Sequence, residues 1–573
     1  MESRNLILAI VLSIGVLLIW SLFVEDPYQQ PMTNNNSDVN LDSSNLNSLE
    51  SQSIDEIEDI LEANDTNSIS LDIALREDQR VQINTNNILG SINLKGLKID
   101  DITLKNYKET LDEESDLIRV LRPYNTRDGY EVTFGWISNQ SSDIELPNSN
   151  TVWKLVNNNK TLTSENEIEF EWKNNTGQTF ISSISMDGDY LFNINQRVIN
   201  NSDDSIILNN ASKIKRKTAP ALSGMFILHE GLLGVLEEQL ELIDYDELKD
   251  DGETLNFESN NGWIGITDKY WLAALIPDQT ENFKAIYTYD NGYIAYFRTL
   301  KSSNVKPGQE LEKNSQIFIG AKEAKLIDQY KEDYDIYNFD LAIDWGWFYF
   351  LTKPLFYVIY YFSELSGNFG LAIIILTVII RIIFFPLANW SFASMAKMKL
   401  LQPEMTRIKD LYKDDRQQQQ QALMALYKKE KVNPVSGCLP ILIQIPFFFA
   451  IYKMLFVSIE MRHAPFYGWI QDLAAKDPTT IFNLFGLIPW DPPSFLIIGI
   501  WPVLMGVTMY LQQKLNPAPP DPIQAKIFAF FPLFITILLA QFAAGLVIYW
   551  TTNNVLSIIQ QWIITRRTKI KTN

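Results

Sequence analysis

The sequence predicts an α-helical polytopic membrane protein with six transmembrane helices, five of which form a core, and a large antiparallel β-sandwich domain outside the membrane. Three observations predict this fold class. Long apolar runs gather at the two ends of the chain, short alternating runs fill residues 73–340, and charge divides sharply between the two parts. At 573 residues, the chain is too long for one ordinary domain.

The formal net charge of −21 is the sum of two unlike parts. Residues 1–340 hold 28 basic and 57 acidic side chains, whereas residues 341–573 hold 20 basic and 12 acidic side chains. This balance excludes a strongly basic DNA-binding protein, so we expect no DNA partner. Because 46% of the residues are hydrophobic, an acidic disordered protein is excluded as well.

The sequence contains few residue patterns typical of catalysis or metal binding. The single cysteine, Cys438, excludes an intramolecular disulfide and a cysteine-based metal cluster, and the two histidines, His229 and His463, are too few for a multi-histidine site. The sequence has no glycine-rich phosphate loop and no nucleophile elbow. We therefore predict no catalytic residues, no metal ligands and no cofactor, and we expect a protein that is not an enzyme.

Residues 1–24 are predicted to form an N-terminal transmembrane anchor. An apolar run of 19 residues ends at Val24, and ~20 residues suffice to cross a bilayer. Arg4 precedes the run, and Glu25 and Asp26 follow it, which places the N-terminus in the cytoplasm. A cleaved signal peptide is the alternative, although no small-residue cleavage site ends the run.

The part that follows the anchor is predicted to lie outside the cytoplasm. Residues 25–72 are rich in Asn, Ser and acidic residues and predict a disordered linker. Residues 73–340 predict an antiparallel β-sandwich, because short alternating runs are separated by Asn, Gly and Asp turns. Such runs lie at residues 88–94, 99–104, 130–136, 167–172 and 285–297.

Residues 341–366 are predicted to form an interfacial amphipathic helix. The segment is rich in Trp, Tyr and Phe, which favour the headgroup level of a membrane. Lys353, Pro354 and Glu364 argue against a clean transmembrane span. The alternative is that the segment forms the first portion of the span that follows.

Residues 367–565 are predicted to hold the five-helix core. Its apolar segments lie at about residues 369–387, 438–457, 495–512, 527–541 and 546–564. As one helix the last apolar run would be about 57 Å long, so we expect a break near Gly545. The loop at 389–437 carries nine Lys or Arg residues, whereas the loop at 458–494 carries two. The positive-inside rule then places the C-terminus in the cytoplasm.

Polar residues inside these apolar segments predict a hydrophilic groove. Arg381 is the most informative, because a charge near the bilayer centre costs ~2.5–3.5 kcal/mol on insertion scales. Thr377 lies one turn before Arg381, and no acidic side chain in the spans can neutralise the arginine. The other predicted groove residues are Gln444, Tyr549, Trp550, Asn553 and Asn554. The alternative is that Arg381 snorkels to the cytoplasmic surface.

The loop at residues 389–436 is predicted to be a cytoplasmic helical hairpin. Apolar residues at spacings of three and four mark one face of each helix; they include Met395, Met398, Met405, Leu426 and Tyr427. Methionine-rich faces adapt to varied apolar partners, and simple packing is the alternative. The basic tail at residues 566–573 could contact lipid phosphates or ribosomal RNA.

The membrane part resembles the YidC/Oxa/Alb family of membrane protein insertases, in its Gram-negative bacterial form. The resemblance covers about residues 341–565. The motifs that carry it are TVIIR at 377–381, FPL at 385–387, SMAKM at 394–398, LQP at 401–403, ALYK at 425–428, EKVNP at 430–434, GCLP at 437–440, QIP at 444–446, MGVTM at 505–509 and GLVIYW at 545–550.

The resemblance implies an insertase and chaperone of the bacterial inner membrane that acts alone or with the Sec translocon and its accessory subunits. It implies nascent membrane proteins as substrates, the ribosome as a partner of the hairpin and tail, and a periplasmic domain similar to sugar-mutarotase sandwiches. The groove arginine of the family falls on Arg381 and its substrate-contacting threonine on Thr377. Trp550 stands where the nearest relatives carry tyrosine.

The expected mechanism begins with attraction of an acidic or polar passenger tail to Arg381, strengthened where water is excluded. The apolar helix of the passenger then moves into lipid. Two alternatives stay open. A small-solute or peptide transporter would also contain a buried arginine, and a membrane-tethered periplasmic carbohydrate-active protein would also contain a β-sandwich.

Overall fold

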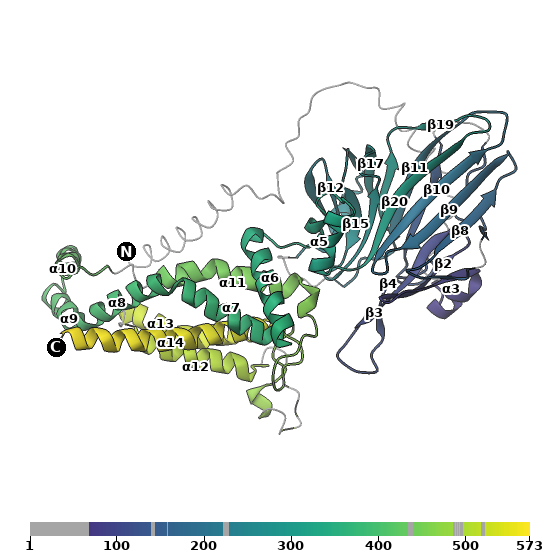
Figure 1. Ribbon diagram of the computed structural model, residues 1–573. Coiled ribbons are helices and arrows are strands. Elements are labelled where there is room, and N and C mark those ends of the chain that lie inside the picture. The colour runs from purple at the N-terminus through teal and green to yellow at the C-terminus, as the bar shows by residue number, and fades with distance from the viewer. Residues whose placement is uncertain are drawn as a thin grey trace, which may run out of the picture. The chain divides into compact units, whose positions relative to one another are not determined.

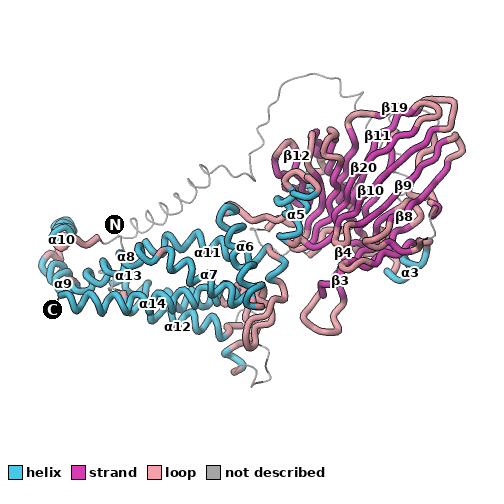
Figure 2. The backbone as a smooth tube through the Cα atoms, in the orientation of Figure 1, coloured by secondary structure: helices cyan, strands magenta, loops and turns pink. Residues whose placement is uncertain are grey.

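The computed structural model describes residues 68–138, 144–156, 159–221, 228–433, 439–484, 488, 490, 492, 497–516 and 522–572 (Figures 1 and 2). The predicted anchor at residues 1–24 and nearly all of the predicted linker at 25–72 lie outside these residues. The chain divides into two compact units, with the boundary between Trp347 and Phe348. We call them the β unit and the helical unit.

The β unit contains two sheets. The first has the strand order β14-β17-β18-β11-β5-β3-β2-β1-β7, with β19 paired to β11 and β4 to β3. Its strands are β1 (Arg80–Asn84), β2 (Ile88–Asn93), β3 (Lys98–Lys108), β4 (Leu117–Leu121), β5 (Tyr130–Ile137), β7 (Thr161–Leu162), β11 (Ile206–Arg216), β14 (Leu255–Ser259), β17 (Phe283–Tyr289), β18 (Tyr293–Thr299) and β19 (Ser303–Val305).

The second sheet has the order β13-β12-β15-β16-β20-β10-β9-β8-β6. Its strands are β6 (Lys154–Leu155), β8 (Glu167–Lys173), β9 (Gln178–Met186), β10 (Leu191–Asn200), β12 (Gly231–Leu236), β13 (Gln239–Asp244), β15 (Trp263–Thr267), β16 (Trp271–Pro277) and β20 (Glu310–Ala321). Among the described strands, every pairing in this sheet is antiparallel, and in the first sheet only the β1–β7 pair is parallel.

The two sheets pack face to face and enclose the core. Hydrogen bonds cross between them: Tyr130 Oη donates to the carbonyl of Ile266 at 3.2 Å, and Tyr287 Oη donates to that of Leu233 at 2.9 Å. Strand β10 alternates buried and half-buried residues along most of its length, as a strand with one face in a core does. The predicted β-sandwich is therefore confirmed.

One predicted run is a hairpin. The alternating residues 285–297 form two strands, β17 and β18, which turn at Asp290, Asn291 and Gly292. Asn291 has a φ of 44° and Gly292 a φ of 150°, and an Asn-Gly pair adopts such left-handed conformations readily. The Asn-Gly turn therefore divides residues 285–297 into two strands, whereas their alternating pattern alone predicts one continuous strand. Helices of the β unit are short: α3 (Leu71–Glu77), α4 (Tyr245–Asp251) and α5 (Ala324–Asp333).

The helical unit contains nine described α-helices. They are α6 (Tyr349–Ser366), α7 (Phe369–Ile383), α8 (Phe385–Leu400), α9 (Gln402–Leu411), α10 (Arg416–Lys429), α11 (Leu439–Val457), α12 (Ile500–Leu515), α13 (Pro522–Leu539) and α14 (Ala544–Thr572). Helix α14 contacts α7, α8, α11 and α12, so it is the central helix of the unit (Figure 1).

The first segment of the predicted core is bent. Helix α7 ends at Ile383 and α8 begins at Phe385, with an angle of 69° between them. Pro386 stands in the first turn of α8, where a proline fits a new helix but cannot continue the old one. The helix therefore ends four residues before the predicted end at Leu387.

By length and composition, none of the described helices alone is long and apolar enough to cross a membrane. The bent pair α7–α8 meets that test when its two parts are taken together. The apolar parts of α11 and α13, Leu442–Val457 and Ala525–Leu539, are shorter. The count of six spans stays a prediction.

Candidate functional site: a small pocket around Arg381

Arg381 lies in the last turn of α7. Asn368 starts this helix by accepting a hydrogen bond from the backbone N–H of Leu371 at 2.9 Å, and the break before Phe385 ends it. A positive side chain near the C-terminus of a helix interacts favourably with the helix dipole. Local structure therefore helps to hold a cation at this position.

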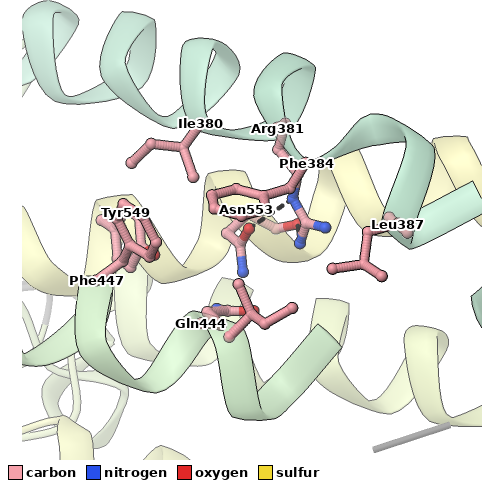
Figure 3. Close-up of a pocket in the computed structure, with 10 residues that line it drawn as sticks. Ile380, Arg381, Phe384, Leu387, Gln444, Phe447, Tyr549 and Asn553 are labelled. Carbon is pink, nitrogen blue, oxygen red and sulfur yellow. Dashed lines mark hydrogen bonds between the residues drawn. The ribbon is translucent and has the colours of Figure 1, made fainter. Parts of the chain in front are cut away.

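The guanidinium of Arg381 reaches α14, as Figure 3 shows. Its Nε donates to Asn553 Oδ1 at 2.7 Å, and its Nη2 donates to the Asn553 carbonyl at 3.1 Å. Nη2 also donates to Ser557 Oγ. Among the described residues, no carboxylate forms an ion pair with Arg381. Its positive charge is held by neutral acceptors and stays uncompensated.

The pocket around Arg381 is small and mostly apolar at its walls. Its volume is about 40 Å³, enough for water but not for a peptide segment. Four predicted groove residues line it: Arg381, Gln444, Tyr549 and Asn553. The other lining residues are Ile380, Phe384, Leu387, Ala388, Ile443 and Phe447.

Thr377 is buried and does not line this pocket. Its hydroxyl donates to the carbonyl of Ile373, four residues earlier on α7, at 2.7 Å. The hydroxyl hydrogen is therefore used within its own helix.

Trp550 and Asn554 do not line this pocket; Trp550 contacts α11 and α12, and Asn554 contacts α12. The ring of Trp550 packs edge-on against Phe448 with 4.9 Å between centroids, and it borders the buried cluster that contains Met505. Asn554 Nδ2 donates to Thr508 Oγ1 on α12 at 3.2 Å. Successive residues of a helix point about 100° apart, so Trp550 and Asn554 point away from the pocket that Tyr549 and Asn553 line.

Ser557 is the contact of Arg381 that sequence reasoning missed. It lies four residues after Asn553, and residues four apart share one helix face. That spacing was the available signal. A single serine in an apolar helix is ordinary, because its hydroxyl can bond to its own backbone, and the signal was therefore weak.

The predicted hairpin residues take part in packing. Met395 is buried in a cluster with Ala388, Phe392 and Ile564 of α14. Met405 is buried on α9, and Tyr427 Oη of α10 lies 3.9 Å from its sulfur. Met398 and Leu426 are half-buried. Helices α9 and α10 contact each other.

The described residues contain no group of three or more His, Cys, Asp and Glu side chains that could hold a metal ion. His229 Nδ1 lies 3.2 Å from Asp244, and this histidine lowers the pKa of the Asp244 carboxyl. Its Nε2 lies 2.9 Å from the carbonyl of Leu232. Both ring nitrogens thus serve the local structure of the β unit.

Comparison with known proteins places both units in one kind of protein. The family model described as "60Kd inner membrane protein" matches residues 361–572, and the model described as "YidC periplasmic domain" matches residues 80–358. The membrane protein insertase YidC of Pelagibacter ubique is 49% identical over 572 residues, which is 100% of each chain. The same-named protein of Rickettsia felis is 45% identical and covers 98% of this chain and 99% of its own length.

Two solved structures are more distant. The crystal structure of an active YidC insertase matches 90% of this chain and 98% of its own, with 19% identity and a TM-score of 0.37. A galactose mutarotase related enzyme from Lactobacillus acidophilus matches 42% of this chain and 97% of its own, with 13% identity and a TM-score of 0.29. At these scores neither likeness supports a further conclusion.

Proposed function

The chain belongs to the YidC family of membrane protein insertases, and on that premise we propose that it inserts its substrates through a polar groove centred on Arg381. Its function as an insertase of nascent membrane proteins follows from the family, as does its membrane association with a periplasmic β-domain. The family consists of insertases and not of enzymes, which agrees with the prediction from the sequence.

The observation that carries the proposal is the uncompensated charge of Arg381. Arg381 donates hydrogen bonds to the side chains of Asn553 and Ser557 and to one backbone carbonyl. Neutral acceptors hold a guanidinium in place without cancelling its charge. The arginine therefore remains able to attract an acidic group of a passenger.

Partial exclusion of water makes this attraction strong enough to matter. Two unit charges 4 Å apart interact by about 1 kcal/mol in bulk water and by about 4 kcal/mol at an effective dielectric constant of 20. Arg381 lies in a pocket that residues of α7, α8, α11 and α14 line, beside the apolar rings of Phe384 and Phe447. A carboxylate that enters this pocket would thus gain more from Arg381 than it would at an exposed surface.

The small pocket implies that passage requires helix movement. About 40 Å³ admits water but no peptide. We infer that the passenger tail separates α7 and α11 as it enters. Its apolar helix then moves into lipid, where burial releases about 25 cal/mol per Å² of apolar surface.

The remaining assignments are part of this proposal. We infer six spans in the inner membrane, with both termini in the cytoplasm and with the α9–α10 hairpin facing the ribosome. The Sec translocon would be a second partner. The basic tail supports contact with lipid or ribosomal phosphate; in it, Arg566 lies over the ring of Trp562 at 4.0 Å.

The test removes the charge of Arg381 and compares two passengers that differ only in the charge of their tails. Purified full-length protein in liposomes is given a single-span passenger with an acidic N-terminal tail, or the same passenger with the acids changed to amides. Arg381→Gln should lower insertion of the acidic passenger by about tenfold, equivalent to about 1.4 kcal/mol, and should spare the amide passenger. Arg381→Lys keeps the charge but not the hydrogen bonds of the guanidinium, so it should insert the acidic passenger better than Arg381→Gln does and less well than wild type. Equal insertion of the acidic passenger by wild type and Arg381→Gln would rule out charge attraction.

A further inference from the structure

Two residues of α14 hold Arg381 from one side. Asn553 and Ser557 are 5% and 1% exposed, and both bond to the guanidinium. They take up Nε and Nη2, whereas Nη1 has no hydrogen bond to any residue that the structure describes. The donor group of Arg381 left for a passenger is therefore Nη1.

The hydroxyl of Ser557 has a fixed direction. It donates its hydrogen to the carbonyl of Asn553 at 2.7 Å, so the bond from Arg381 must be received by an oxygen lone pair. The same carbonyl also accepts from Arg381 Nη2 at 3.1 Å. Arginine, serine and backbone thus form a closed set of hydrogen bonds, which limits rotation of the guanidinium.

We infer that Ser557, together with Asn553, is a positioning residue that turns Nη1 of Arg381 toward the groove and so sets the preference for acidic passengers. This inference rests on the proposed function, because it gives the arginine its direction and not its charge. Without the serine oxygen, the guanidinium loses one of its two side-chain acceptors on α14. It can then rotate, and its charge is no longer aimed at one place.

The experiment uses two substitutions of nearly equal size in the full-length protein in liposomes. Ser557→Thr keeps the hydroxyl, and Ser557→Val removes it. The passengers are the acidic-tail protein and its amide counterpart. We expect Ser557→Val to lower the acidic-to-amide insertion ratio about fivefold and Ser557→Thr to keep that ratio within twofold of wild type. Ser557→Ala repeats the loss with a smaller side chain, in case valine disturbs packing.

Thr551→Val is the matched control. Thr551 is buried on the same helix and donates to the carbonyl four residues earlier, at 2.8 Å, as Ser557 does, but it does not touch Arg381. The insertion ratio should be unchanged in this variant. If Ser557→Val and Ser557→Ala lower insertion of both passengers equally, or change neither, the positioning role is overturned.

The outcome separates this inference from the proposed function. If Arg381→Gln does not distinguish the two passengers, charge attraction itself fails. If Arg381→Gln distinguishes them and neither Ser557→Val nor Ser557→Ala does, only the positioning role fails.

Discussion

Each unit contains an arginine held in its interior, and the two differ in what holds them. In the β unit, Arg80 pairs with Asp100, and the two side chains are 5% and 3% exposed. In the helical unit, Arg381 bonds to the amide oxygen of Asn553. An aspartate and an asparagine have nearly the same shape, so the main difference between these partners is a negative charge.

The rest of the two arrangements is alike. Arg80 Nε donates to Ser91 Oγ at 2.8 Å, as Arg381 Nη2 donates to Ser557 Oγ. A buried arginine with a carboxylate is neutral as a pair and serves the structure of a sheet. A buried arginine with amide and hydroxyl acceptors is fixed in position yet still charged. The comparison teaches that the partner, and not burial alone, decides whether the charge of a buried cation is neutralised within the protein.

The largest effect should come from removing the arginine of the paired site in the β unit. Arg80→Gln leaves the Asp100 carboxylate buried without a counter-charge, and removing one partner of a buried pair costs about 3–5 kcal/mol of unfolding free energy. Hydrogen exchange of the amides in β1, β2 and β3 of the full-length protein would measure this loss. Glu171→Gln breaks the exposed pair with Lys173 and should cost less than about 1 kcal/mol. A similar small loss for Arg80→Gln would contradict the comparison.

Giving Arg381 a carboxylate partner should have an intermediate effect. Asn553→Asp keeps the shape of the residue and supplies Arg381 with a carboxylate, as Asp100 does for Arg80. Because the charge of Arg381 is then neutralised, the variant should insert acidic-tail passengers about tenfold less efficiently than wild type, which corresponds to about 1.4 kcal/mol. Its insertion of passengers with a basic tail should become more efficient. The acidic-tail and basic-tail passengers, tested side by side in liposomes, control for each other. An unchanged ratio of acidic-tail to basic-tail insertion would refute the role of charge.

The smallest expected effect is a pH dependence of the β unit. Burial raises the pKa of Asp100 from 3.8 to about 6, against the pull of Arg80. Because the folded pKa lies above the unfolded one, this group contributes stability that is complete below pH 3.8 and is lost as the pH rises through 6. From pH 5 to pH 7 the loss should be about 1 kcal/mol, because one pKa unit is 1.36 kcal/mol.

Exchange of the β1–β3 amides at pH 5 and pH 7, corrected for intrinsic exchange rates, measures this loss. The pH dependence should disappear in Asp100→Asn, which has no titrating carboxyl. A contribution from Asp100 that grew between pH 5 and pH 7 would contradict the raised pKa.

Polarity within apolar segments was enough to predict part of the lining of the pocket around Arg381. Arg381, Gln444 and Asn553 stand out because polar groups in lipid need partners, and the structure gathers them in one pocket. Trp550 and Asn554 could not be assigned to a face from their presence in a polar cluster, because adjacent residues on a helix point in different directions.

The sandwich was predictable from alternation, but its connections depend on turn residues. Asn291 and Gly292 form a hairpin where the period of two continues through the sequence. In the helical unit, the apolar pattern also runs through Phe384, and Pro386 divides it into α7 and α8. Hydrophobic patterns thus give the layers of this protein, whereas single turn and proline residues give its breaks.

The N-terminal end of α14 is fixed by backbone bonds. The amide of Ala544 donates to the carbonyl of Ala475 at 2.7 Å, and the amide of Gly545 donates to that of Leu473 at 3.0 Å. Such an end acts as a pivot. At 1.5 Å per residue, Asn553 lies about 14 Å from this pivot and Ile564 about 30 Å. A swing of α14 about this fixed end would therefore move Ile564 about twice as far as Asn553. The space between α14 and its neighbours would widen most at the C-terminal end of the helix.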